Sequence, residues 1–173
     1  MRGFQALTTV SPMPDAPIAI RPATAADLPV LLQFQQGVVE AERPFDPTLK
    51  SGELHYYDLA ALLGDPETYL AVAECAGQVV ASGYAQIRAA KAYLRHARYA
   101  YLGFMYVVPA FRGRGLNARI IDALLAWAAA QGITEARLEV YAENQAALKA
   151  YRNYGFAGHM LEMRIGLEPL QQK

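Results

Sequence analysis

Apolar residues recur along the chain at two spacings, one typical of strands and the other of helices. Leu28, Leu31 and Val38 follow at helical intervals after Thr24 and Asp27, which have the spacing of a capping box. Helices are predicted at residues 24–38, 56–63, 116–131 and 144–154, with a polar loop at 40–52. Strands are predicted at 18–22, 68–75, 78–87, 99–108 and 137–141, with one or two closing strands within 156–167.

The order of these elements predicts an α/β protein. A tight turn at Ala76 and Gly77 joins two strands as a hairpin, whereas the helix at 116–131 connects its strands as a crossover. A chain that has both hairpin and crossover connections is predicted to form a sheet with both antiparallel and parallel strands, flanked by helices. A chain of 173 residues suits one core, so one domain is predicted from 18 to 173. Residues 1–17, which contain three prolines and no periodicity, are predicted to form a flexible N-terminal arm.

Composition narrows the function classes. Hydrophobic residues make up 54% of the chain, and 16 basic residues balance 16 acidic ones, so net charge is zero. Nucleic acid is not expected as a partner, because binding phosphates through bulk charge needs a basic surplus. The single Cys75, the lack of an apolar run long enough for a membrane span and the lack of a signal peptide predict a cytoplasmic protein without membrane contact. The histidines lack the spacing of metal ligands, so no metal is predicted.

Candidate chemistry gathers after the strand at 99–108. Arg112, Gly113, Arg114 and Gly115 stand between this strand and a helix. The free amides of a helix N-terminus, its dipole and two arginines favour binding of a phosphate or diphosphate. The glycines and Ala118 also fit the G-x-G-x-x-A dinucleotide pattern, so an NAD(P)-binding protein stays open as an alternative.

Two stretches resemble the GNAT (Gcn5-related) N-acetyltransferase family. VVPAFRGRG at 107–115 is similar to its acyl-CoA motif: Arg or Gln, two variable residues, Gly, one variable residue, then Gly or Ala. LEVYAENQAALKAYRNYGF at 138–156 is similar to its strand, N-x-x-A-x-x-x-Y helix and closing G-F pair. This sequence departs from the first motif at Asn117, where the family has Gly or Ala.

The resemblance implies a GNAT fold, with a mostly antiparallel sheet splayed between its fourth and fifth strands, and acetyl-CoA as cosubstrate. The backbone of Met105, Tyr106 and Val107 is then expected to bind the pantetheine arm. The diphosphate is assigned to Arg112 and to the backbone amides from Gly113 to Ala118, which include Arg114, Gly115 and Asn117. Asn144 is expected to contact the cofactor, or to serve only as a helix cap. Tyr151 is expected to protonate the departing thiolate, or to be only a core residue.

The reaction implied is acetyl transfer to a primary amine of a small molecule or peptide. Residues 102–104 carry no carboxylate, so the base is left open: a water held by Tyr84, Tyr101 or Glu139, or an amine that arrives neutral. Glu40, Glu42, Phe45 and Asp46 could attract an ammonium group through charge and cation–π contact, or form only a solvated loop. A non-catalytic acyl-CoA sensor of the same fold stays an alternative. The oligomeric state, a homodimer included, is also left open.

Overall fold

The computed structural model describes residues 16–167, and the chain divides at Glu139 and Val140 into two compact units, each described by itself. The predicted arm at 1–17 lies outside the described residues except for its last two. None of the helices within 16–167 is both long and apolar enough to cross a membrane.

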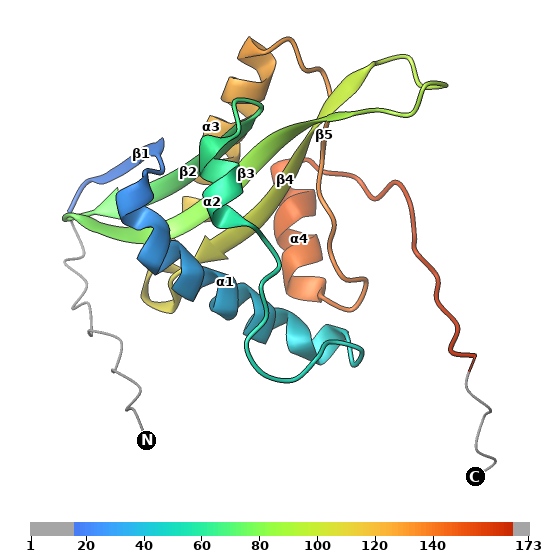
Figure 1. Ribbon diagram of the computed structural model, residues 1–173, viewed down its shortest axis with the longest axis horizontal. Coiled ribbons are helices and arrows are strands. Elements are labelled where there is room, and N and C mark those ends of the chain that lie inside the picture. The colour runs from blue at the N-terminus through green and yellow to red at the C-terminus, as the bar shows by residue number, and fades with distance from the viewer. Residues whose placement is uncertain (1–15, 168–173) are drawn as a thin grey trace. The chain divides into compact units, whose positions relative to one another are not determined.

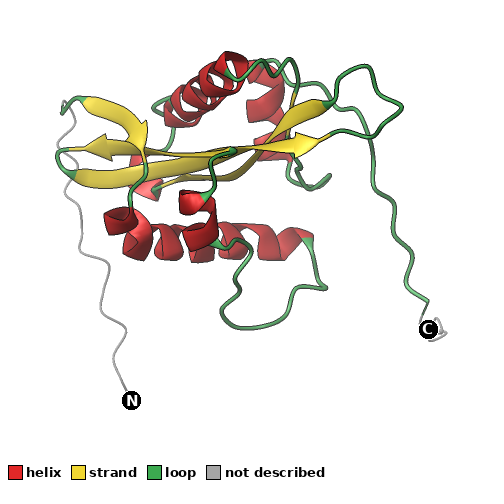
Figure 2. Cartoon of the chain, turned by 45° about the horizontal axis from the view of Figure 1, so that its top comes forward, coloured by secondary structure: helices red, strands yellow, loops and turns green. Residues whose placement is uncertain are grey.

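The first unit is built on a five-stranded sheet (Figure 1). Its strands, in spatial as in chain order, are β1 (Ile18–Pro22), β2 (Thr68–Cys75), β3 (Gln78–Ala89), β4 (Arg98–Val107) and β5 (Ala136–Arg137). Neighbours are antiparallel except β4 and β5, which are parallel. Helices α1 (Leu28–Glu42) and α2 (Leu59–Gly64) cover one face, and α3 (Leu116–Ala130) covers the other (Figure 2). The α/β class and the mixed, mostly antiparallel sheet are confirmed.

Alternating side chains of the strands fill two apolar layers. On the face under α1 and α2, the buried side chains come from these two helices and from the strands below them: Leu31, Phe34, Val38, Leu59, Leu70, Val72, Tyr84 and Phe104. On the opposite face Gly83 lies under α3, so close that an added Cβ would stand 2.7 Å from the Ile120 Cγ2 atom. α3 therefore packs against the backbone of β3, which brings the start of this helix next to the end of β4.

The predicted capping box precedes α1. The Thr24 backbone N–H donates to the Asp27 Oδ2 atom at 2.7 Å, and Arg21 donates to both carboxylate oxygens at 2.8 and 2.9 Å. Arg21 also donates from Nε to Glu74 on β2 at 2.7 Å. The hydrogen bonds from Arg21, against the cost of burial, lower the pKa of Asp27 to about 2. This carboxylate therefore links the start of α1 to the edge of the sheet.

We expect Asp27→Asn to lower the free energy of unfolding by about 2 kcal/mol at neutral pH, since the folded state holds the ionised form. A depressed pKa stabilises the fold above the ordinary Asp pKa, near 4, and this stabilisation is lost as the pH falls toward 2. Urea unfolding of both proteins at pH 7 and at about pH 3 should therefore show that the difference between their free energies of unfolding is smaller at the lower pH. Glu53→Gln, at an exposed position, is the control. A difference in unfolding free energy that does not change with pH would contradict the role given to the ionised Asp27.

Several predicted elements differ from the structure. The helix predicted at 56–63 begins at Leu59, because the Asp58 side chain accepts from the Ala61 N–H and sets its start. The strand predicted at 137–141 is only β5, because its ladder with β4 ends after Ala100–Ala136 and Tyr101–Arg137. Residues 156–167 form no strand, and the side chains that alternate there are exposed: Leu161, Met163, Ile165 and Leu167. A strand needs a partner for its backbone, and this stretch pairs with none among the described residues.

The predicted loop at 40–52 also begins later than expected. α1 continues to Glu42, and a short 3-10 turn, Arg43–Phe45, follows it. The second unit contains α4 (Gln145–Tyr154), as predicted, capped by Asn144 and ended at Gly155.

Candidate active site

A β-bulge interrupts β4 near its end. Tyr84 pairs with Gly103 and Ser82 with Tyr106, so Phe104 and Met105 together face the single residue Gly83. Phe104 has a φ of 56°, in the left-handed region that non-glycine residues rarely adopt. Two hydrogen bonds hold it: the Ser82 hydroxyl donates to the Phe104 carbonyl at 3.2 Å, and the Phe104 N–H donates to the Tyr57 hydroxyl at 3.3 Å. The bulge thus changes the direction of the backbone that leads into Met105, Tyr106 and Val107.

Within the first unit, the edge of β4 that faces β5 is unpaired beyond Tyr101. Within the first unit the parallel ladder contains only Ala100–Ala136 and Tyr101–Arg137, so residues 102–107 have no strand partner on this side. We call residues 102–107 the open edge. The side chains here are fixed: Met105 lies under α3 beside Gly83, and the Tyr106 ring packs 4.7 Å from the Phe34 ring. The open edge therefore presents backbone, as the predicted splay requires.

Residues 112–115, the glycine loop, follow the open edge. Gly113 and Gly115 have φ values of 74° and 73°, and an added Cβ at either would meet no atom within 4 Å. Phe111 is buried and anchors the turn before the loop. The Arg112 Nε donates to the Val107 carbonyl at 3.1 Å, and the Arg114 guanidinium lies 4.9 Å from the Phe111 ring centroid.

α3 begins at Leu116 without a side-chain cap, and Asn117 and Ala118 are half-buried in its first turn. The first turn of α3 has backbone amides that no side chain caps, the two glycines leave open space beside them, and the two arginines add positive charge. Together these features fit a diphosphate.

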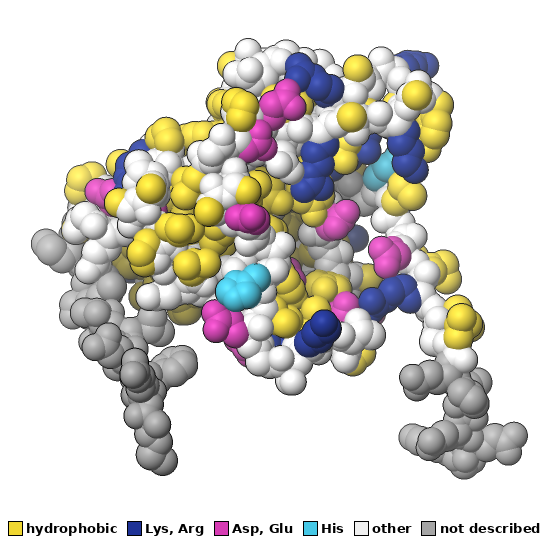
Figure 3. Space-filling view, viewed as in Figure 1, with side chains coloured by type: hydrophobic (Ala, Val, Ile, Leu, Met, Phe, Trp, Pro, Cys, Tyr) yellow, Lys and Arg dark blue, Asp and Glu magenta, His cyan; other side chains and the backbone are white. Residues whose placement is uncertain are grey.

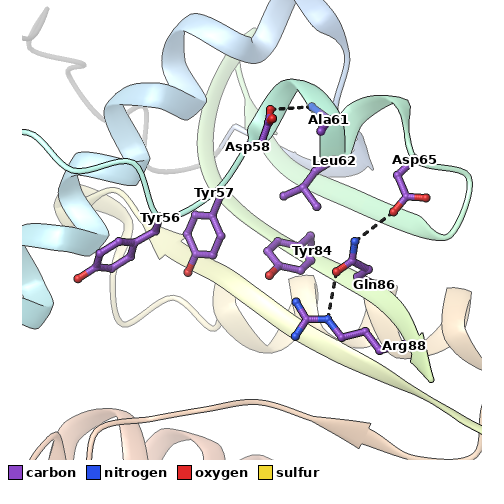
Figure 4. Close-up of a pocket in the computed structure, with 9 residues that line it drawn as sticks. All are labelled: Tyr56, Tyr57, Asp58, Ala61, Leu62, Asp65, Tyr84, Gln86 and Arg88. Atoms are coloured by element: carbon purple, nitrogen blue, oxygen red, sulfur yellow. Dashed lines mark hydrogen bonds between the residues drawn. The ribbon is translucent and has the colours of Figure 1, made fainter. Parts of the chain in front are cut away.

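A tyrosine pocket of about 440 Å³ opens between the start of α2 and β3 (Figure 4). Its walls come from both elements and from the loop before α2: Tyr56, Tyr57, Asp58, Ala61, Leu62, Asp65, Tyr84, Gln86 and Arg88. Tyr57 stands between this tyrosine pocket and the bulge, because its ring lies 5.3 Å from Phe104 and 5.7 Å from Tyr84. Of these residues, the sequence analysis named Tyr84, as a side chain able to hold a water, but neither Gln86 nor Arg88.

Tyr101 stands beside the pocket with a charged group on either side. Its ring lies 6.4 Å from Tyr84 and carries the Arg88 guanidinium at 3.7 Å from its centroid, and its hydroxyl donates to the Glu139 Oε2 atom at 3.2 Å. Burial raises the pKa of Tyr101 and of Tyr84, and the negative charge of Glu139 adds to the rise. Both phenols are therefore protonated at neutral pH and act as donors. Of the three groups considered for holding water, Glu139 is the one able to take a proton.

The acidic residues at the end of α1 and just after it have separate partners. Glu40 accepts from the Arg43 Nε at 2.7 Å, and Asp46 is buried and accepts from the Thr48 backbone N–H at 2.9 Å. Phe45 is half-buried in the 3-10 turn. Burial raises the pKa of Glu42, against a hydrogen bond with the Tyr56 hydroxyl that lowers it. Of this group, Glu42 is therefore the residue that reaches a wall of the tyrosine pocket.

The second unit carries the two remaining predicted residues on α4. The Asn144 side chain accepts from the Ala147 N–H at 3.1 Å, so its role as helix cap is present. Tyr151 and Tyr154 both contact Phe156: the ring centroid of Tyr151 lies 5.9 Å from that of Phe156, and the ring centroid of Tyr154 lies 5.8 Å from it.

Charges of both signs are interspersed on the face of the molecule drawn in Figure 3. This face shows no large area of one sign, as expected of a chain whose formal charges balance.

Comparison with solved structures shows the fold. Several solved acetyltransferases share the fold, among them an aminoglycoside 6'-N-acetyltransferase, AAC(6')-IG, from Acinetobacter haemolyticus (TM-score 0.68, 21% identity, 86% of this chain and 97% of that one). Aminoglycoside N-acetyltransferase AAC(6')-Iy in complex with CoA is another (TM-score 0.65, 18% identity, 86% and 99%).

The model of the acetyltransferase (GNAT) family matches residues 35–156, and the chain belongs to this family. It is also 28% identical to an aminoglycoside N(6')-acetyltransferase type 1 from Stenotrophomonas maltophilia over 156 residues, which cover 87% of this chain and 94% of that one.

Proposed function

We propose that this protein transfers an acetyl group from acetyl-CoA to a primary amine of a small molecule or peptide. The observation that carries the proposal is the open edge of β4 followed, after the short turn at Pro109–Phe111, by the glycine loop at the start of α3. Membership of the GNAT family supports it, as does similarity to proteins named as aminoglycoside N-acetyltransferases.

The chain offers a separate group to each part of the cosubstrate. The open edge, with the backbone of Met105, Tyr106 and Val107, suits the amide-bearing pantetheine arm. The glycine loop and first turn of α3 suit the diphosphate, with backbone amides from Gly113 to Ala118 and the charge of Arg112. We assign Asn144 a contact with the cosubstrate in addition to its cap. Acetyl-CoA itself supplies the activated thioester.

Two residues are assigned to proton transfer. Glu139, held by the Tyr101 hydroxyl, takes the proton of the acceptor amine through a water, so that nitrogen can form its bond to the acetyl carbon. As the carbon–sulfur bond breaks, Tyr151 gives its phenolic proton to the thiolate. The tyrosine pocket holds the acceptor, because Tyr57 joins this pocket to the bulge on β4. Without transfer to any amine, the same features would describe an acyl-CoA sensor.

Ligand stabilisation tests the cosubstrate part of the proposal. We expect acetyl-CoA and CoA to stabilise the fold, by about 2.7 kcal/mol at 100 times the dissociation constant, and NADPH not to. Thermal unfolding with each ligand measures the difference. Stabilisation by NADPH together with none by CoA would instead favour the dinucleotide interpretation of the glycine loop.

A further inference from the structure

Arg88 is held in a fixed position in the wall of the tyrosine pocket. Its guanidinium carbon lies over the Tyr101 ring, 3.7 Å from the ring centroid, and its Nε donates to the Gln86 Oε1 atom at 3.1 Å. The Gln86 amide in turn donates to Asp65 at 3.1 Å (Figure 4). This chain of hydrogen bonds fixes the plane of the guanidinium, and the Nη atoms point away from Gln86, toward Tyr84.

Arg88 is one of the arginines of the first unit that pair with no carboxylate of the described residues. Those that pair with a carboxylate are Arg21, Arg43, Arg98 and Arg137. The polar contacts of Arg88 are with neutral groups, Gln86 and the Tyr84 hydroxyl. A half-buried guanidinium with only neutral partners has capacity for an anion, and its planar edge matches the two oxygens of a carboxylate.

The other charges of the pocket limit which anion suits it. Asp58 accepts from the Ala61 N–H at 3.0 Å, and Asp65 accepts from the Thr68 hydroxyl at 2.7 Å as well as from Gln86. The hydrogen bonds from Thr68, Glu67 and Gln86 lower the pKa of Asp65, so it is ionised at neutral pH. Two carboxylates and one guanidinium in the wall of the same pocket disfavour a polyanion and favour a molecule with one negative and one positive group.

We propose that Arg88 binds the carboxylate of the acceptor, and that the acceptor is therefore an amine of the amino-acid class. This inference rests on the proposed function and narrows its substrate. The remaining walls, Tyr56, Tyr57 and Leu62, are aromatic or aliphatic and suit an apolar side chain. A polycationic aminoglycoside, by contrast, would place ammonium groups beside Arg88.

The test compares each free amino acid with its own carboxamide, which keeps the amine and removes the carboxylate charge. L-Leucine, L-methionine and L-phenylalanine serve as probes, and release of the CoA thiol measures kcat/KM. In the parent protein we expect each acid to be preferred over its amide. Arg88→Gln should lower kcat/KM for the acid by about 10- to 100-fold, mostly through KM, and leave the amide nearly unchanged. Because the amide's amine is the more easily deprotonated, the change in the acid-to-amide ratio between the two proteins is decisive.

Arg98→Gln is the matched control, because Arg98 already pairs with Glu67 at 2.9 Å; this variant should keep the parental ratio. Arg88→Lys should recover part of the preference. An unchanged ratio in Arg88→Gln, or faster turnover of kanamycin than of every acid, would overturn the carboxylate assignment while the acetyltransferase function stands. If no amine is acetylated, calorimetric titration of the acids into the CoA-bound parent and Arg88→Gln proteins still decides, and equal affinities would refute the proposal.

Discussion

Tyr151→Phe is expected to lower kcat by about 10²-fold while acetyl-CoA binds with nearly parental affinity. The substitution keeps the ring, which packs against Phe156, and removes only the hydroxyl. The proton is needed only as negative charge develops on sulfur, so its loss affects the transition state more than the bound state. A thiolate is already a fair leaving group, which places the effect at the low end of general-acid contributions.

Tyr154→Phe provides the control from the same helix. Tyr154 packs against the same Phe156 ring at a similar distance but lies outside the family motif. Steady-state kinetics of both variants on one acetylated amine, with CoA affinity measured separately, compare them. Parental turnover by Tyr151→Phe, or failure of Tyr154→Phe alone, would show that Tyr151 is not the acid.

Gly115→Val is expected to weaken CoA binding by roughly 10- to 100-fold. At a φ of 73° a β-branched residue is strained, and its side chain would occupy the open surface where the diphosphate approaches the first amides of α3. Loss of one charge-assisted hydrogen bond costs about 1.5 to 3 kcal/mol, which corresponds to this range. Arg114→Ala should weaken binding less, because Arg114 is exposed at the variable position of the motif and its charge is screened.

Gly132→Val separates backbone strain from loss of the ligand site. Gly132 has a φ of 74° and open space around it, but it follows the opposite end of α3. Both valine variants should lose similar stability, and only Gly115→Val should lose CoA affinity in calorimetric titration. Equal losses of affinity in the two variants would remove the glycine loop from the site.

Local signals in the sequence predicted much of this structure. The ends of β2 follow directly from its apolar run and the turn that ends it, and Asn144 caps α4 where its side-chain chemistry predicts. Gly113 and Gly115 adopt the left-handed conformation that a loop entering a helix requires. Each of these features depends on residues a few positions apart.

Features that depend on distant partners were missed. The bulge places Phe104 at a positive φ, a backbone conformation that a phenylalanine in the sequence does not predict. Gly83 and Gly103, glycines inside two neighbouring strands, were the available signal. Arg88 lies 13 residues before Tyr101, the ring against which it packs across the β3–β4 hairpin, so its place in the pocket became visible only once the strands were paired. The shortness of β5 likewise depends on where β4 stops pairing.

Transfer of acetyl to an amine is the most direct test of the proposed function. The parent protein is incubated with acetyl-CoA and a panel of free amino acids, aminoglycosides and short peptides, and both CoA thiol and acetylated product are measured. We predict turnover that saturates in both substrates, with one acetylated amine formed for each thiol released. Tight binding of acetyl-CoA without acetylation of any amine would contradict the proposal and leave an acyl-CoA sensor as the function of this fold.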